Sequence, residues 1–352
     1  GVEVKKIKIN DKFIGEDCPA FVVVEAGCNH EGSLELAKKL VDGAVLGGAD
    51  AIKFQHYEPK KLATKTVPYF WVNERDGTSQ FEKYKEQKLL TKDGFKEIAE
   101  YCEEKKIIFF STPFDNENVD FLEELNVPLY KIAATDLTNI PFLRYVAKKG
   151  RPIAFSAGMC TIGEIEDAIE AMKSEGNDQL IPLHCIVVYP TPARIANLNF
   201  IKTLKKLFPD YPIGFSDHTL GVNIPAIAVS LGAKLVEKHY TLDKTMTGTS
   251  DHAISVDVKD LKLMVENIRE AEVCMGLRTK ILLPEEKGAY LYGRRKIVAN
   301  QDILKGTILN RDMITCKRSA EGLYPRFFDM LIGRKANVDI SEDEGITWDK
   351  VS

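Results

Sequence analysis

Histidines are the residues of this chain whose placement most strongly suggests chemistry. His218 in GFSDHT and His239 in EKHYTL end two consecutive apolar runs. Paired imidazoles can hold one divalent ion and leave positions open for water and substrate. We therefore predict a metal site at these two residues, the alternative being two imidazoles satisfied by hydrogen bonds. His30, His56 and His184 also follow apolar runs, and we assign them structural roles.

Two lysines lie inside apolar runs, Lys53 in AIKFQ and Lys131 in LYKIAAT. An ammonium group is costly to bury without an anionic partner. Both lysines are therefore candidates for binding the phosphate or carboxylate of a ligand. The alternative is that each is paired with a neighbouring glutamate.

Side chains alternate between the two faces of a β-strand, so residues two positions apart share a face. The pairs that share a face are Lys53 with Gln55, Ser216 with His218, and Glu237 with His239. Glu25 ends another run, in EAGCNHEG, where a carboxylate near a metal could orient or deprotonate water. Asp251 belongs to a loop rich in Gly, Thr and Ser that could fold over a substrate. Glu25, Glu237 and Asp251 are thus the candidate catalytic carboxylates.

The apolar runs that carry these residues alternate with amphipathic segments of helical spacing, several of which open with a capping Ser or Thr. This repeat predicts a (β/α)8 barrel, in which reactive side chains project from the C-terminal ends of the strands. The eight predicted strands are 21–27, 51–55, 107–114, 129–135, 152–159, 180–185, 212–218 and 234–240.

The pattern of elements divides the chain into a large and a small part. We predict a barrel domain over 1–277. It begins with a hairpin at 2–16, and this hairpin is expected to close the floor of the barrel. A polar, irregular linker follows at 278–293, and 294–352 suit a small β-rich domain.

Composition excludes several classes of function. The 352 residues carry a formal net charge of −4, and no basic run is long enough to neutralise many phosphates, which argues against nucleic acid. No segment has the length and apolarity of a membrane span or the order of a signal peptide, so we expect a cytoplasmic protein without membrane contact. Most of the seven scattered cysteines are expected to be reduced core residues.

Eight ordered segments resemble the sialic acid synthase family. They are EAGCNHEGS, AIKFQ, FFSTPFD, YKIA, SAGM, LHC followed by YPTP, GFSDHTLG, and EKHYTLDK. The tail is similar to the antifreeze-like (SAF) domain that this family carries, through DILKGTIL, CKRSAEGLYPRF and LIGRKA. Together the segments span nearly the whole chain.

The resemblance implies a site for phosphoenolpyruvate deep in the barrel, near Lys53, Thr112, Lys131, Ser156 and Ser216. It implies a divalent metal on His218 and His239, commonly manganese, with magnesium or cobalt as alternatives. Glu25 would handle the reacting water, and Gln55, Tyr189 and Asp251 would contact the sugar. Arg318 would reach from the tail of one subunit into the barrel of another, which implies a domain-swapped homodimer.

Two positions depart from the family pattern. Ala134 stands where relatives usually have serine, and Val187 where they often have a polar residue. Both are expected to line the phosphoenolpyruvate pocket. Thr135 is predicted to share the strand face of Lys131 and so to supply a replacement hydroxyl.

The expected reaction joins phosphoenolpyruvate to an N-acetylated amino-sugar aldehyde such as N-acetylmannosamine. Legionaminic or pseudaminic acid synthesis from a diacetamido-trideoxyhexose is one alternative. Others are an aldolase with a Schiff-base lysine and a carbohydrate- or ice-binding protein on a degenerate barrel. A phosphorylated acceptor would need a cationic cluster, for which Lys61, Lys65 and Arg75 are candidates, although solvated surface charge explains these residues better.

Overall fold

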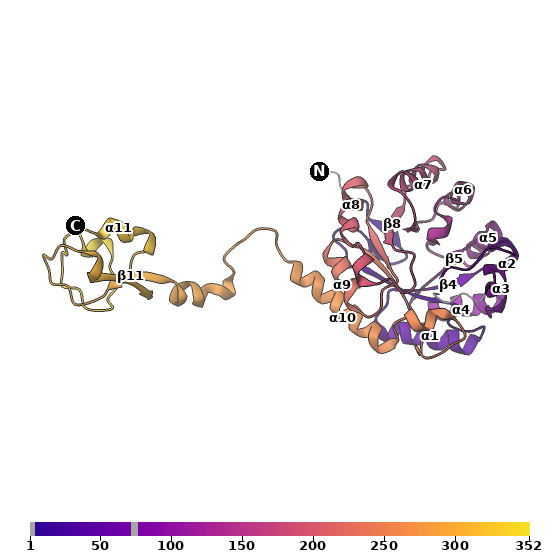
Figure 1. Cartoon of the computed structure of the whole chain (residues 1–352), viewed down its shortest axis with the longest axis horizontal. Coiled ribbons are helices and arrows are strands. Elements are labelled where there is room, and N and C mark those ends of the chain that lie inside the picture. Colours follow the sequence, from indigo (N-terminus) through magenta and orange to yellow (C-terminus); the bar gives the residue numbers. More distant parts are fainter. Residues whose placement is uncertain (1–3, 72–76) are drawn as a thin grey trace. The chain divides into compact units, whose positions relative to one another are not determined.

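The computed structural model describes residues 4–71 and 77–352. The chain forms two compact units, Gly1–Gly276 and Leu277–Ser352 (Figure 1). The first unit contains all the strands of the predicted barrel. Arg75 lies outside the described residues.

Eight parallel strands form the centre of the first unit. They are β3 (Phe21–Gly27), β4 (Ala51–His56), β5 (Ile108–Pro113), β6 (Tyr130–Ile132), β7 (Ile153–Ala157), β8 (Leu180–Cys185), β9 (Gly214–Asp217) and β10 (Leu235–His239). Their hydrogen-bonded order is β5-β4-β3-β10-β9-β8-β7-β6, and β5 and β6 approach each other, so the barrel is nearly closed. The predicted (β/α)8 fold is confirmed.

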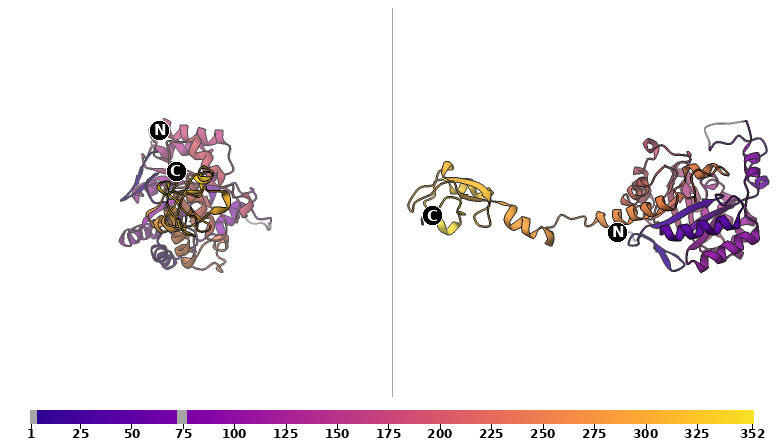
Figure 2. Two further views of the ribbon diagram at one scale, coloured as in Figure 1. Left: turned by 90° about the vertical axis from the view of Figure 1, so that its left-hand side faces the viewer. Right: turned by 90° about the horizontal axis from the view of Figure 1, so that it is seen from below.

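Helices cover the outside of this barrel (Figures 1 and 2). They are α1 (Leu34–Gly47), α2 (Pro59–Leu62), α3 (Gln80–Glu86), α4 (Lys92–Glu104), α5 (Asn116–Glu124), α6 (Ile140–Ala147), α7 (Ile162–Ser174), α8 (Asn199–Leu207), α9 (Asn223–Ser230) and α10 (Val258–Met275). Ser33, Thr91 and Thr161 cap α1, α4 and α7 by accepting a hydrogen bond from a first-turn N–H. The predicted capping residues thus fix where these helices begin.

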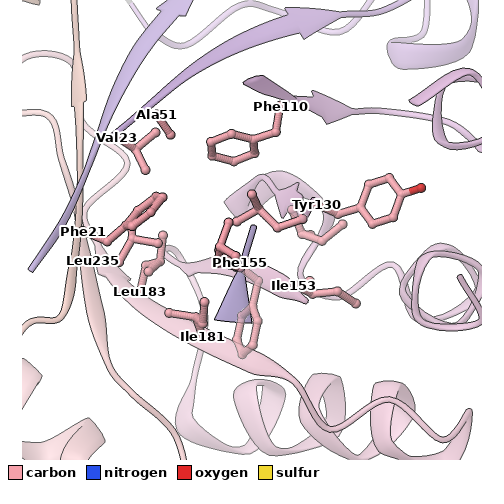
Figure 3. Packing of buried hydrophobic residues seen from close by; sticks show 14 of the residues in the cluster. Phe21, Val23, Ala51, Phe110, Tyr130, Ile153, Phe155, Ile181, Leu183 and Leu235 are labelled. Carbon is pink, nitrogen blue, oxygen red and sulfur yellow. The ribbon is translucent and has the colours of Figure 1, made fainter. Parts of the chain in front are cut away.

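The inward face of the strands changes from apolar to polar along each strand. On β3, Phe21 and Val23 precede Glu25 on the same face, and on β10 Leu235 precedes Glu237. Figure 3 shows Phe21, Val23 and Leu235 among the apolar side chains that pack together. This packing leaves the polar residues at the C-terminal mouth of the barrel.

The opposite end of the barrel is covered by the hairpin of β1 (Ile7–Ile9) and β2 (Lys12–Ile14), as the sequence predicts. Asn10 occupies the turn with φ of 54°, a left-handed conformation that asparagine tolerates. The Lys12 ammonium lies 2.5 Å from the carboxylate of Asp50, the residue that precedes β4. The hairpin therefore lies at the N-terminal ends of the strands, away from the mouth.

The second unit has its own small apolar core. Its antiparallel strands β11 (Arg295–Ala299) and β12 (Ile314–Arg318) and helix α11 (Phe328–Leu331) surround buried residues such as Ile297, Ile314 and Ile346. The segment before β11 contains a short 3-10 helix, Pro284–Glu286, and a short π-helix, Ala289–Gly293. In neither unit does the described part contain a helix long and apolar enough to cross a bilayer.

Candidate active site

Two lysines and two glutamates meet at the barrel mouth. Lys53 contacts Glu25, donates to Thr112 Oγ1 at 2.6 Å, and lies 3.9 Å from Glu237 Oε1. Lys131 lies 3.3 Å from the same Glu237 oxygen. All four charged side chains are at least 93% shielded from solvent. The alternative interpretation, in which each lysine is paired with a neighbouring glutamate, is therefore observed, and ligand binding by the two lysines stays a prediction.

The two glutamates have opposite protonation tendencies. Burial raises the pKa of Glu25 to about 7, an effect that Lys53 only partly offsets. Burial also opposes ionisation of Glu237, but Lys131 and Lys53 outweigh it and lower the pKa of Glu237 to about 2. At neutral pH Glu237 is the fixed anion of the cluster, and Glu25 is able to take up or release a proton.

The other predicted side chains of the barrel line the same place. A deep cavity of about 70 Å³ is lined by every predicted site residue of the barrel except Asp251. Gln55 Nε2 donates to Glu25 Oε1 at 3.1 Å, which fixes that carboxylate from the side away from Lys53. Cys185, expected to be an ordinary core residue, also lines this cavity. The alternation of faces along β8 places it there, a signal that the sequence contained.

His218 and His239 lie side by side, with ring centroids 5.4 Å apart. Burial lowers the pKa of His218 to about 4 and that of His239 to about 3, so both imidazoles are neutral, as metal ligands must be. His218 Nδ1 lies 2.7 Å from the carbonyl oxygen of Ile186, which leaves Nε2 free to accept. His239 Nδ1 is buried without a hydrogen bond in the described part of the chain.

This donor pair fits a divalent ion such as manganese as two ligands. The described residues contain no group of three or more His, Cys, Asp or Glu side chains arranged to hold a metal. Asp251 Oδ2 is 3.5 Å from His239 Nδ1. The remaining coordination positions would fall to substrate and water.

The loop that carries Asp251 is held by its neighbour His252. His252 is fully buried, with Nδ1 2.6 Å from Thr241 Oγ1 and Nε2 3.0 Å from Glu31 Oε1. Thr249 Oγ1 donates to Asn29 Oδ1 at 2.6 Å, which joins the loop to the end of β3. These bonds hold the Asp251 carboxylate beside His239.

A second, wider cavity of about 770 Å³ opens outside the first. Gln55, Tyr189 and His239 line both, so the two spaces are continuous. Aromatic residues between positions 57 and 84 and Phe114 line the wider cavity, and the sequence analysis did not identify them. Their segments lie between predicted elements, and nothing in their spacing indicates that they meet.

The prediction for Thr135 is wrong. β6 ends at Ile132, and Thr135 lies in the short turn Ala134–Asp136, so strand alternation no longer relates it to Lys131. Thr135 lines the wider cavity and not the deep one. Ala134 lines both cavities, and Val187 lines the wider one.

The lining of the two cavities does not include the other predicted residues of the described part of the chain, Arg318, Lys61 and Lys65. Arg318 ends β12 in the second unit, exposed to solvent and opposite Arg295 across the strand pair. Lys61 is bonded to the surface carboxylates of Glu58 at 2.9 Å and Glu117 at 2.6 Å. Lys65 is exposed, and neither lysine lines the cavities.

Comparison with known proteins identifies the family of each part of the chain. Residues 40–280 match the NeuB family, and residues 294–352 match the SAF domain. The chain belongs to the NeuB family. The resemblance to sialic acid synthases with an antifreeze-like tail is therefore confirmed.

Relatives in this family are named as synthases of different sugar acids. The chain is 36% identical to an N,N′-diacetyllegionaminic acid synthase of Legionella pneumophila, over 98% of each chain. It is also 36% identical to the human N-acetylneuraminate-9-phosphate synthase, over 95% of this chain and 93% of the relative. The crystal structure of an N-acetylneuraminic acid synthetase from Leptospira borgpetersenii superposes with a TM-score of 0.73 at 33% identity, covering 82% of this chain and 95% of the other.

Proposed function

We propose that this NeuB-family chain condenses phosphoenolpyruvate with the open-chain aldehyde of an N-acetylated amino sugar. C3 of phosphoenolpyruvate forms a bond with the aldehyde carbon, whose oxygen becomes a hydroxyl. Water adds at C2, and phosphate leaves by cleavage of the C–O bond. The products are a nonulosonic acid and inorganic phosphate.

The observation that carries the proposal is the pair of buried lysines at the end of the barrel interior. Phosphoenolpyruvate has a phosphate and a carboxylate, and two ammonium groups in one enclosed space match these two anions. Thr112, Ser156 and Ser216 add hydroxyl groups to the same cavity. Burying a lysine costs free energy and adds nothing to apolar packing. The same burial strengthens the attraction of the ammonium group for an anionic ligand.

Glu25 is suited to move the proton of the water that adds at C2. Its pKa of about 7 lets it accept a proton near neutral pH, whereas Glu237 stays ionised. Gln55 and Lys53 hold the Glu25 carboxylate from two sides. Glu237 Oε1 lies 3.9 Å from Lys53 Nζ and 3.3 Å from Lys131 Nζ, so it is the shared partner of the two ammonium groups before the ligand binds.

We further propose that a divalent ion, manganese in the first instance, binds to His218 and His239. Such an ion would stabilise the negative charge that develops on the aldehyde oxygen. Asp251 and Tyr189, which contact or flank these histidines, would then orient the sugar beside the deep cavity.

The two other functional alternatives have less support. A Schiff-base aldolase needs a neutral lysine, but Glu237 and Glu25 raise the pKa of Lys53 more than its burial lowers it. A degenerate barrel in a binding protein would have lost its strand-end side chains, and here only Ala134 and Val187 replace expected polar residues. Neither alternative explains why the lysines, glutamates and histidines share one cavity.

The test measures phosphate release by the metal-stripped full chain with phosphoenolpyruvate, added manganese and a panel of N-acetylated sugars. We expect release that requires both metal and sugar. Lys131→Met should abolish it, whereas Lys148→Met, a matched change at an exposed lysine, should leave it intact. Release without sugar, or activity that survives chelation, would contradict the proposal.

A further inference from the structure

One side of the wider cavity is formed by a single loop. Residues 247–251, which lie between β10 and α10, all line this cavity, and in the described part of the chain none of them lines the deep cavity. The proposed reaction uses the deep cavity for phosphoenolpyruvate and the wider one for the sugar. We call residues 247–251 the sugar-side loop, because they belong to the sugar half of the site alone.

The segment that follows β3 is bonded to this loop at two of its residues. Thr249 Oγ1 donates to Asn29 Oδ1 at 2.6 Å. Two residues further along the segment, Glu31 Oε1 accepts from the backbone N–H of Gly248 at 3.1 Å and lies 3.0 Å from His252 Nε2. An ionised carboxylate only accepts hydrogen bonds, so His252 is the donor of that bond. Glu31 therefore holds the chain on both sides of residues 249–251.

The position of Glu31 indicates a role for its side chain outside the cavities. The described lining of the two cavities includes neither Glu31 nor His252. The backbone of Glu31 has φ of 49°, a left-handed conformation that glycine or asparagine adopts more readily than glutamate. A glutamate at this position is explained by its carboxylate, which accepts the bonds from Gly248 and His252. Because His252 is fully buried, water cannot replace Glu31 as the acceptor of its Nε2–H.

We infer that Glu31 is a positioning residue for the acceptor sugar, which acts by clamping the sugar-side loop through Gly248 and His252. The clamp fixes where Asp251 lies beside His239. The inference rests on the proposed condensation and adds to it a residue that lines neither cavity. Loss of the clamp releases the sugar half of the site and leaves the phosphoenolpyruvate half in place.

The first experiment measures KM for both substrates in variants of Glu31, at saturating manganese and with an N-acetylated sugar that supports phosphate release. Glu31→Ala should raise KM for the sugar by about tenfold, because the buried N–H of His252 loses its acceptor. KM for phosphoenolpyruvate should not change. Glu31→Gln keeps an acceptor oxygen and should cause a smaller rise. Glu35→Ala is the matched control on α1, since the Glu35 side chain is 78% exposed, and should alter neither constant.

The split between the two substrates decides the outcome. A rise of both KM values together in Glu31→Ala would indicate a general structural defect and overturn the inference, and so would two unchanged KM values. In either case the proposed function stands, because the unaltered chain still releases phosphate with sugar. Absence of sugar-dependent release by the unaltered chain would instead overturn the proposed function.

Gly248→Ala tests the clamp from the side of the loop. A Cβ at Gly248 would overlap the carboxylate of Glu31, which is the far end of a flexible side chain, so alanine displaces that carboxylate and not the backbone. Gly248 is not among the positive-φ residues of the described chain, so alanine suits its backbone. Gly248→Ala should therefore raise KM for the sugar as Glu31→Ala does. The double variant should be no worse than either single variant, whereas effects that multiply would show that the two residues act separately and refute the clamp.

Hydrogen exchange gives a measure of the clamp that does not depend on turnover. Glu31→Ala should make amides of residues 247–252 exchange about tenfold faster, because the loop opens more often without its acceptor. Amides of β4 should keep their exchange rates, and Glu35→Ala should leave both regions unchanged. Equal exchange of residues 247–252 in Glu31→Ala and the unaltered chain would refute the clamp whether or not the condensation is observed.

Discussion

A buried ion pair outside the cavity holds the turn that carries His218, and its disruption gives a sharp prediction. Lys238 Nζ lies 2.8 Å from Asp217 Oδ2 and also donates to the carbonyl oxygen of Thr219. Asp217 Oδ1 accepts the Thr219 N–H at 2.8 Å. By strand alternation, Lys238 and Asp217 point away from the face of Glu237, so the pair positions His218 without lining the site.

The expected cost of breaking this pair follows from its burial. Both side chains are at most 1% exposed, so Lys238→Met leaves a buried carboxylate and a carbonyl oxygen without their cation. Removing one partner of such a pair costs about 3–5 kcal/mol in the free energy of unfolding. Combining Lys238→Met with Asp217→Asn removes the uncompensated charge. The double variant should therefore lose less unfolding free energy than the single variant Lys238→Met.

The assay is urea unfolding at constant pH, monitored by a barrel signal because the two units need not unfold together. Lys244→Met is the matched control, since Lys244 is 44% exposed in its pair with Asp260 and should contribute under about 1 kcal/mol. The metal concentration for half-maximal activity should also rise in Lys238→Met, because His218 loses its support. If the two single costs simply add in the double variant, the proposed coupling is refuted.

Three further predictions address other parts of the chain. Glu25→Gln should lower kcat by roughly 10²–10⁴-fold while equilibrium binding of phosphoenolpyruvate persists; an unchanged kcat would remove Glu25 from proton transfer. Burial lowers the pKa of His30 to about 4, so its contribution to stability is complete above pH 6.5 and is lost as the pH falls to 4. The loss of unfolding free energy between pH 6.5 and pH 4 that comes from His30 is about 3 kcal/mol. The variant His30→Gln should lack this part of the pH dependence of unfolding. Arg318→Ala should keep the fold but weaken sugar use in a chain that sediments as a dimer; a fully active monomer would contradict the swapped arrangement.

Strand alternation explains why so much of the site could be predicted. Once β4 and β10 are recognised, the period of two alone places Lys53 with Gln55 and Glu237 with His239 on the inward face. The C-terminal ends of parallel strands meet at the barrel mouth, so residues distant in sequence converge there without further information. The lining of the deep cavity follows from these two rules.

Features outside the strands could not be predicted in this way. Thr135 was misplaced because β6 is three residues long and its last predicted residues form a turn. The aromatic lining of the wider cavity joins Tyr57, Trp71 and Tyr84 on α3. Its geometry depends on how loops pack over the barrel, and loop conformation follows no short sequence period.

The buried lysines and glutamates at the barrel mouth do not balance each other in charge. Lys53 and Lys131 share the ionised carboxylate of Glu237, whereas the pKa of about 7 leaves Glu25 partly protonated at neutral pH. Two cations therefore face less than two full negative charges in an enclosed space, so the empty cavity has an excess of positive charge. An anion that enters relieves this excess, and its arrival further favours the protonated form of Glu25. Ligand binding and protonation of Glu25 are thus coupled, so Glu25 can act as a base only in the fraction of molecules in which it stays ionised.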